Sequence, residues 1–489
     1  MNFKTDWSFL DKISMGAVGS KKVISQLNAS GHNIIELERY STCNKIWSTK
    51  IKRLRLPDLI CLNCGKRIES RAKSTLAVKM SDNANNPQRH WDSGLRDDDI
   101  VAFIHCTKED DDWIAGSTIN AFTIKSMRDS VGASRLGSPK SRYEGSERDR
   151  EWKTIVPKKD GKVIEIVDLK DKKQIRVCYE DGTKYTYSLK DPHNMRIYCS
   201  KGDSFKGNES IIAGVIGEKE SLVCKTKHYS FIDDLKSKLP EVRYAGAKAL
   251  GYLGQTKDNI DSLYTALAVE QDTRIKLEIY ASLLRLDENL WDDYYNYAMS
   301  LQEPEYRMEY ALILGEFVEN SEASKALVKI ANNSAFEEEL RAAAIWGMKV
   351  NSDTIPNLLM FARNDSEILS NHAIARLKLG MKPVYTKIIV DQIVDDSSGS
   401  IVLNVLVKLE QLNEKDLVNI LLSEPEDSVK RKWILKIIGM LGKDRFMMYE
   451  KDLCYVAGRE IIESLWQYKK YEIPIDRIIA IDFLEKQGY

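Results

Sequence analysis

The sequence predicts a multidomain α+β protein with three parts: a mixed α/β domain at the N-terminus, a small β-barrel and a C-terminal α-solenoid. Three observations predict this order. Helical and strand-like segments are mixed over residues 1–137, short alternating strands with tight turns occupy residues 152–228, and helical segments recur over residues 229–489. A chain of 489 residues has room for about two to four domains.

The N-terminal domain is expected to begin with a helix and continue as a mixed sheet. Apolar residues at helical spacing predict the helix, and period-two alternation predicts the strands. One strand places Glu36 and Glu38 on the same face. The expected elements are a helix over residues 15–29 and strands over residues 34–40, 76–80 and 100–105.

Between these strands, two apolar-rich runs flank the tight-turn signal Asn63-Cys64-Gly65 and predict a β-hairpin. If Leu62 pairs with Gly65, the register places Asp58 directly opposite Glu69. Opposed residues on one sheet face have Cβ atoms roughly 4.5–5.5 Å apart. Two carboxylates this close repel each other unless a proton or a cation lies between them, and a divalent metal ion is the usual occupant.

The same strand brings two bases to this surface. Because strand side chains alternate, Arg71 and Lys73 share the face of Glu69. Two acids and two bases on one surface are what metal-assisted phosphodiester hydrolysis requires, and Glu36 or Glu38 is a candidate third acid. The alternative interpretation is an ordinary exposed sheet face with cross-strand ion pairs.

This hairpin, with Asp58 on one strand and Glu69-Ser-Arg71-Ala-Lys73 on the next, resembles the PD-(D/E)XK nuclease superfamily. The resemblance implies that Asp58 and Glu69 are ligands of Mg²⁺ (or Mn²⁺), together with the backbone carbonyl of Ser70. The chain departs from the family pattern at Arg71, where lysine is usual. We therefore expect Arg71, which stays charged, to hold phosphate, and Lys73 to orient the nucleophile. The same departure leaves room for an inactive nuclease-like domain.

The charge distribution favours a polyanionic partner for this domain. The first 80 residues contain 15 Lys and Arg against 6 Asp and Glu, although the whole chain has no net charge. We expect Arg53, Arg55, Arg71 and Lys73 to contact nucleic acid. The alternative is a solvated basic surface.

The eight cysteines are scattered, and only Cys61 and Cys64 form a close pair. A zinc site needs four ligands, and no second Cys/His pair follows at a suitable spacing. Cys43, His90 and Cys106 are candidate ligands in three dimensions, but no pattern selects them. We therefore expect reduced, mostly structural thiols.

The middle of the chain is expected to hold a linker and a barrel. Residues 138–151 are polar and rich in turn formers, which predicts the linker. Residues 152–228 resemble SH3-like or Tudor-like modules. Tyr179, Tyr185 and Tyr187 are candidates for a surface on which bases stack, although aromatic residues on strands are usually core.

The C-terminal half is repetitive and resembles HEAT repeats. Similar segments carry Arg243, Arg274, Arg307 and Arg341, which are 31, 33 and 34 residues apart. Helix pairs at such a period are typical of an α-solenoid. We expect these arginines to make hydrogen bonds and ion pairs between repeats rather than to line a phosphate track.

Two functional hypotheses follow. The first is a metal-dependent DNA endonuclease in which the barrel and the solenoid position double-stranded DNA or a protein partner, in prokaryotic defence or restriction. The second is a non-catalytic scaffold, with a degenerate nuclease fold, that binds nucleic acid or protein. A DNA-repair glycosylase of HEAT type is a third, with no supporting signature. A homodimer is compatible with either of the first two, and the lack of a signal peptide or long apolar run predicts a cytoplasmic protein without membrane contact.

Overall fold

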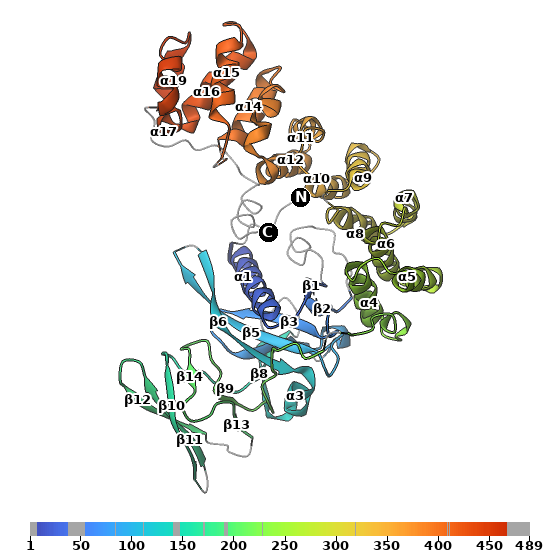
Figure 1. Cartoon of the computed structure of the whole chain (residues 1–489), viewed down its shortest axis with the longest axis vertical. Coiled ribbons are helices and arrows are strands. Elements are labelled where there is room, and N and C mark those ends of the chain that lie inside the picture. Colours follow the sequence, from blue (N-terminus) through green and yellow to red (C-terminus); the bar gives the residue numbers. More distant parts are fainter. Residues whose placement is uncertain are drawn as a thin grey trace. The chain divides into compact units, whose positions relative to one another are not determined.

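The computed structural model describes residues 7–37, 54–83, 85–110, 112–139, 147–169, 172–189, 194–226, 228–317, 319–407, 409 and 411–466. These residues form two compact units, residues 7–290 and residues 291–466. The first unit contains sheets and helices, and the described elements of the second are all helices (Figure 1). The protein is therefore of the α+β class, with an N-terminal sheet region and a C-terminal helical region. Within the described ranges, no helix is long and apolar enough to cross a membrane.

The first unit is built around a five-stranded sheet. Its strands, in spatial order, are β1 (Ile34–Glu36), β2 (Leu59–Cys61), β3 (Arg67–Lys73), β5 (Ile100–Glu109) and β6 (Asp112–Thr123). Neighbouring strands are antiparallel except β3 and β5, which are parallel. Helix α1 (Trp7–Ala29) packs on one face of this sheet, where Leu27, Leu59, Ile68 and Ile104 are buried together.

The local predictions for this region are confirmed. The helix expected over residues 15–29 is the C-terminal part of α1, and the last two expected strands correspond to β4 (Val78–Asp82) and β5. The strand expected over residues 34–40 begins with β1, and residues 38–40 lie outside the described part of the chain. The hairpin register is also confirmed, because Leu59 pairs with Ile68 and Ile60 pairs with Arg67.

The other face of the sheet belongs to a core that continues into the middle of the chain. Phe103 and Phe122 are buried in the same apolar cluster as Trp152 and Val177. The rings of Trp91 and Trp152 meet edge to face with centroids 4.9 Å apart. One core therefore crosses the expected boundary between the first domain and the barrel, because apolar side chains from both sides fill the same interior.

The linker predicted over residues 138–151 is wrong for residues 148–151, and residues 140–146 lie outside the described part of the chain. Residues 148–152 form strand β8 (Arg148–Trp152), which lies between β4 and β7 (Ser134–Pro139) in a three-stranded antiparallel sheet. The polar residues of β8 are explained in part by cross-strand ion pairs. Arg150 Nε donates to Asp82 Oδ2 at 2.7 Å, and Asp82 is buried.

Residues 152–228 contain two small sheets. The first has the order β12-β11-β10-β14 and the second the order β13-β15-β9. Strands β10, β11 and β12 form an antiparallel meander that matches the three alternating segments seen in the sequence. The bounds are β9 (Thr154–Ile155), β10 (Gly161–Leu169), β11 (Lys172–Tyr179), β12 (Lys184–Leu189), β13 (Arg196–Ile197), β14 (Ser204–Phe205) and β15 (Ala213–Gly214).

Helices complete the first unit. Ile60 and Leu62 of the hairpin are buried together with Phe231 and Tyr244, so the hairpin packs against the first helices that follow the two small sheets. The helical elements are α3 (Ile124–Asp129), α4 (Pro240–Tyr252), α5 (Lys257–Val269) and α6 (Thr273–Arg285), with short 3₁₀ turns at Pro87–Arg89, Val131–Ala133 and Asp234–Lys236.

The second unit is a succession of helices. The elements are α7 (Trp291–Ser300), α8 (Pro304–Leu314), α9 (Ser321–Asn332), α10 (Glu338–Gly347), α11 (Ile355–Ala362), α12 (Glu367–Gly380), α13 (Thr386–Val390), α14 (Asp396–Leu406), α15 (Glu414–Ser423), α16 (Val429–Leu441), α17 (Lys443–Phe446), α18 (Glu450–Leu453) and α19 (Arg459–Trp466), with 3₁₀ turns at Pro383–Tyr385 and Met447–Tyr449. Helices α8, α10, α12, α14, α16 and α19 contact one another in that order, and α11, α13 and α15 form a second row. Each helix thus packs mainly against elements close to it in sequence.

The repeated arginines have structural partners, as expected. Arg243 forms a two-point ion pair with Glu270, with Nε–Oε2 at 2.7 Å and Nη2–Oε1 at 3.0 Å. Arg307 Nη2 lies 2.8 Å from Glu337 Oε1, a residue of the next helix pair. Arg341 Nε donates to the carbonyl of Ala331 at 2.8 Å. Arg274, by contrast, pairs with Asp272 of its own helix cap.

Candidate active site on the β2–β3 hairpin

The two acids singled out in the sequence lie next to each other. Asp58 directly precedes β2, and its Oδ2 accepts a hydrogen bond of 2.7 Å from the backbone amide of Ser70. Glu69 is the residue before Ser70, and the register of the hairpin places it opposite Asp58. The turn and the alternation of the two strands are therefore sufficient to place the two acidic residues opposite each other.

Glu69 is buried and already has a cationic neighbour. Its side chain is 10% exposed and forms an ion pair with the guanidinium of Arg71, whose own side chain is 41% exposed. The two residues are separated by one position on β3, so they share a face of the strand. In this structure, Arg71 is a cation that offsets the charge of Glu69.

The remaining predicted site residues are spread along the same strand and beyond it. Lys73 ends β3 and lies in register with His105 of β5, whose Nε2 is 3.1 Å from the carbonyl oxygen of Ser74. Ser70 is in register with Ala102 of the same strand. Arg55 is exposed, and Arg53 lies outside the described residues.

A third acid from β1 is not brought to this face. Glu36 pairs with Leu59, whose side chain packs beneath α1, so Glu36 belongs to the opposite face from Asp58 and Glu69. Of the two candidate third acids, Glu36 thus lies on the other face of the sheet, and Glu38 lies outside the described residues. Within the described part of the chain, Asp58 and Glu69 do not belong to a cluster of three or more His, Cys, Asp or Glu ligand atoms.

Two adjacent carboxylates fit magnesium, although they do not complete a site by themselves. Mg²⁺ is commonly held by one or two carboxylates and keeps several water molecules, so it does not need a full set of protein ligands. Asp58 and Glu69 are the residues that would hold it. The contact between Glu69 and Arg71 is the feature of this donor set that fits a metal site least well, because the guanidinium competes for the same carboxylate.

Beneath the acids, a buried ion pair fixes strand β3. Arg67 is two residues before Glu69 and lies on the same face of the strand. Its Nε donates to Asp99 Oδ1 at 2.9 Å and its Nη2 to Asp99 Oδ2 at 2.5 Å, and the two side chains are 1% and 0% exposed. Asp99 immediately precedes β5, so this pair ties the two parallel strands together at the level of the site.

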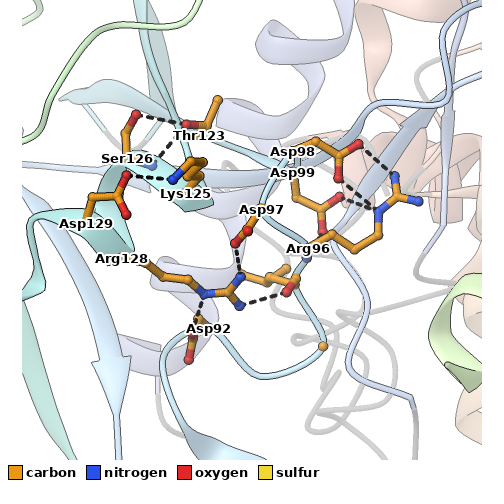
Figure 2. A network of polar contacts seen from close by, with 12 residues as sticks. Asp92, Arg96, Asp97, Asp98, Asp99, Thr123, Lys125, Ser126, Arg128 and Asp129 are labelled. Atoms are coloured by element: carbon orange, nitrogen blue, oxygen red, sulfur yellow. Dashed lines mark hydrogen bonds and ion pairs between the residues drawn. The ribbon is translucent and has the colours of Figure 1, made fainter.

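A wider network holds the loop that leads into β5, as Figure 2 shows. Arg96 extends from this loop toward Asp98 and Asp99, and its amide donates to Asp99 Oδ2 at 2.6 Å. Arg128 of α3 bridges Asp92 and Asp97. Burial alone would raise the pKa of Asp92, but the hydrogen bonds from Arg128 and His90 and the positive charge of Arg128 together outweigh it, and the pKa is lowered. These contacts are structural, and they explain the run of acids at residues 97–99.

The tyrosines of the middle region do not form one exposed surface. Tyr179 is buried, and its hydroxyl oxygen lies 2.7 Å from that of Tyr187. Tyr185 is 52% exposed and packs edge to face on Tyr187, with ring centroids 4.7 Å apart. Of the three predicted stacking residues, Tyr185 is therefore the one with an exposed ring.

The cysteines divide into two groups. Burial raises the pKa of both Cys106 and Cys199 to about 11, which keeps these thiols protonated and agrees with the expected structural role. Cys61 and Cys64 instead lie close to His32 and Cys224. Neither His32 nor Cys224 is near the Cys-x-x-Cys pair in sequence, so no local spacing indicates them as ligands. Cys43, one of the candidate ligands, is outside the described residues.

The comparisons with known proteins leave the family open. No family model matches the chain, and no curated protein matches it. Among solved structures, YibA from E. coli has 15% identity and a TM-score of 0.24, covering 52% of this chain and 91% of that one. Human deoxyhypusine hydroxylase in complex with glycerol has 13% identity and a TM-score of 0.21, covering 52% of this chain and 95% of that one. These similarities are too low to carry an argument about fold or activity.

Proposed function

We propose that this protein is a metal-dependent nuclease that hydrolyses phosphodiester bonds in double-stranded DNA. The observation that supports the proposal most directly is the neighbouring position of Asp58 and Glu69, with the Asp58 carboxylate held by the amide of Ser70 at 2.7 Å. Two carboxylates on residues that lie opposite each other repel unless a proton or a cation lies between them, and a divalent cation meets this need. The basic residues Arg71 and Lys73 of β3 lie on the same face of the strand as Glu69.

Each residue has a distinct role in this proposal. Asp58 and Glu69 hold Mg²⁺, which when bound lowers the pKa of a water molecule and stabilises charge on the phosphate. Arg71, with its planar guanidinium, binds a phosphate oxygen rather than acting as a base. Lys73 orients the attacking nucleophile from the end of β3.

The rest of the chain is proposed to position the target. In this proposal the two small sheets form an SH3-like or Tudor-like module and the C-terminal helices form a HEAT-type solenoid. The two rows of sequential helix contacts support the solenoid, since each repeat of such an architecture packs on its neighbours. A protein partner on the helical surface, a cytoplasmic location and a role in prokaryotic defence belong to the same proposal.

A second candidate function is a non-catalytic scaffold that binds nucleic acid or protein. The observation that favours it is the ion pair between Glu69 and Arg71, because this contact provides a charge partner for Glu69 without a metal ion. In the scaffold, the Asp58 carboxylate would have a structural role, accepting the hydrogen bond from the backbone amide of Ser70 in β3.

Plasmid cleavage separates the two candidates. The nuclease should nick or cut plasmid DNA with Mg²⁺ or Mn²⁺ and stop in chelator, and both Asp58→Asn and Glu69→Gln should lose activity by about 100-fold or more. Asp129→Asn is the matched control, because Asp129 is an exposed acid of the same unit, paired with Lys125. Cleavage that persists in both site variants would rule out this site. Absence of cleavage by folded wild-type protein with either metal would favour the scaffold.

The two basic residues can be assigned separately. The Lys73→Ala variant should lose turnover while keeping its affinity for DNA. The Arg71→Lys variant should weaken DNA binding in part, since lysine keeps the positive charge but lacks the planar guanidinium that donates two parallel hydrogen bonds. DNA affinity should also fall steeply with salt if these residues contact phosphates. The reverse pattern of losses would exchange the two roles.

A further inference from the structure

A second site lies at the tip of the same hairpin, and it is built from sulfur and nitrogen. The side chains of His32, Cys61, Cys64 and Cys224 place their ligand atoms within 4.8 Å of one another. They come from three separate segments: the connection between α1 and β1, the hairpin turn, and the stretch between β15 and α4. Four such atoms converging from distant parts of the chain form a closed set of the kind that holds a metal ion.

The distances agree with a tetrahedral zinc ion. Zinc bonds of about 2.3 Å to sulfur and about 2.0 Å to nitrogen place a sulfur and a nitrogen ligand about 3.5 Å apart in a tetrahedral site. Cys64 Sγ lies 3.8 Å from His32 Nδ1, close to this value. Three cysteines and one histidine are a common ligand set of structural zinc sites, which leave no position open for a substrate.

The histidine is oriented as a metal ligand requires. Its Nε2 lies 3.1 Å from the carbonyl oxygen of Leu222, and a carbonyl can only accept, so Nε2 carries the proton in this bond. The neutral ring then has a lone pair on Nδ1, the atom that faces Cys64. A ligand histidine whose other nitrogen is bonded to a backbone carbonyl is the usual arrangement around zinc, and it fixes both the tautomer and the angle of the ring.

The backbone of the turn supports the same conclusion. Gly65, directly after Cys64, has a φ of +70°, a conformation that most other residues avoid. The amide of Gly65 also donates to the carbonyl of Cys61 at 2.9 Å, which closes the turn around the two sulfurs.

The third segment is held in place independently of any metal. The amide of Cys224 donates to the carbonyl of Ser30 at 3.1 Å, and the amide of Tyr229 donates to the carbonyl of Asn63 at 3.2 Å. Lys66 forms an ion pair with Glu220. The chain after the small sheets is thereby bound to both the turn and the end of α1, so Cys224 is positioned by its neighbours.

We propose that His32, Cys61, Cys64 and Cys224 bind one structural zinc ion. The ion would connect the β2–β3 hairpin to the segment of chain that leads into α4. The site is separate from the proposed nuclease chemistry and does not depend on it. The stabilising effect of the ion would be local. Cys61 ends β2 and Cys64 precedes β3, so a bound ion would hold the conformation of the turn that sets the register of the two strands.

The first test is the metal content of the full-length protein purified without chelator. We expect about one zinc ion per chain by elemental mass spectrometry, and its release when a mercurial reagent blocks the thiols. Replacement by Co²⁺ should give the absorption of a tetrahedral cobalt–thiolate site. Folded protein with no zinc and no capacity to take up Co²⁺, or with a disulfide between Cys61 and Cys64, would overturn the proposal.

Variants then assign the ligands. Cys64→Ser and Cys224→Ser should each lower the zinc content to about a tenth or less, because a closed four-ligand site loses most of its affinity with one thiolate. Cys178→Ser is the matched control, because Cys178 is also partly buried but does not belong to the cluster. Zinc retained at full occupancy in both ligand variants would refute the assignment.

Substitution of the histidine keeps the test independent of folding defects. His32→Cys supplies a fourth thiolate, so it should keep zinc and strengthen the charge-transfer absorption of the cobalt form, whereas His32→Ala should lose metal. Equal zinc content in His32→Ala and wild type would show that His32 is not a ligand and would overturn the four-ligand site.

Discussion

The buried pair Arg67–Asp99 offers the sharpest test of how the hairpin is held against the rest of the sheet. The substitution is Asp99→Asn, which keeps the shape of the side chain but removes its charge. Asp99 accepts hydrogen bonds from Arg67 Nε at 2.9 Å, from Arg67 Nη2 at 2.5 Å and from the amide of Arg96 at 2.6 Å. An asparagine has one carbonyl oxygen, and its amide group would face the guanidinium as a second donor.

The expected cost follows from burial. Both side chains are almost completely inaccessible, at 1% and 0% exposure, so the substitution leaves an uncompensated guanidinium away from water. Removing one partner of a buried ion pair typically costs about 3–5 kcal/mol. A change of about 1.4 kcal/mol in free energy alters an equilibrium constant tenfold. The equilibrium constant for local opening of β3 and β5 should therefore rise by at least about a hundredfold.

Amide hydrogen exchange by mass spectrometry is the suitable assay, because it resolves β3 and β5 from the helical unit. Peptides that cover residues 67–73 and 100–109 should exchange at least about a hundredfold faster in Asp99→Asn. Asp129→Asn is the control, since its pair with Lys125 has side chains 63% and 64% exposed, and removing such a solvent-exposed pair should leave the protection of both strands unchanged. Equal protection of the two strands in both variants would show that the buried pair does not hold them together.

Two further predictions concern other parts of the chain. Burial lowers the pKa of His372 to about 4, below the value near 6.5 of an exposed histidine. The folded state therefore binds this proton more weakly than the unfolded state. Stability should be unaffected above about pH 6.5 and fall by about 3 kcal/mol as the pH drops toward 4, and His372→Gln should flatten that slope in urea titrations of the helical unit. If the slope is unchanged, another group is responsible. Gly65→Ala should destabilise the hairpin by about 1–3 kcal/mol, because φ is +70° and a Cβ would lie 2.6 Å from the ring of Tyr229. Gly16→Ala in α1 meets nothing within 4 Å and should stabilise by up to about 1 kcal/mol, so a thermal melt in which both glycine variants behave alike would contradict this account.

The sequence alone was sufficient for features that depend on short-range patterns. A turn signal and period-two alternation predicted the register that pairs Leu59 with Ile68, and with it the position of Asp58 opposite Glu69. The helix at the N-terminus and the helical character of the C-terminal half followed from apolar periodicity in the same way. These features are local because the geometry of a strand or a helix repeats every few residues.

Features that join distant segments were decided by the tertiary structure. The face on which Glu36 lies depends on how β1 pairs with β2, which the spacing within β1 does not reveal. The polar residues 138–151 suggested a domain boundary, but Phe103 and Trp152 are buried in one apolar core that includes residues from both sides of it.

The cysteine–histidine cluster illustrates the same limit. Cys61 and Cys64 are recognisable as a pair because a turn brings neighbours in sequence together. His32 and Cys224 become candidate ligands only when the chain folds back on itself, with the amide of Cys224 bonded to the carbonyl of Ser30. A metal site needs ligands that converge in space, and convergence between segments far apart in sequence is set by the packing of the whole unit, which no local pattern encodes.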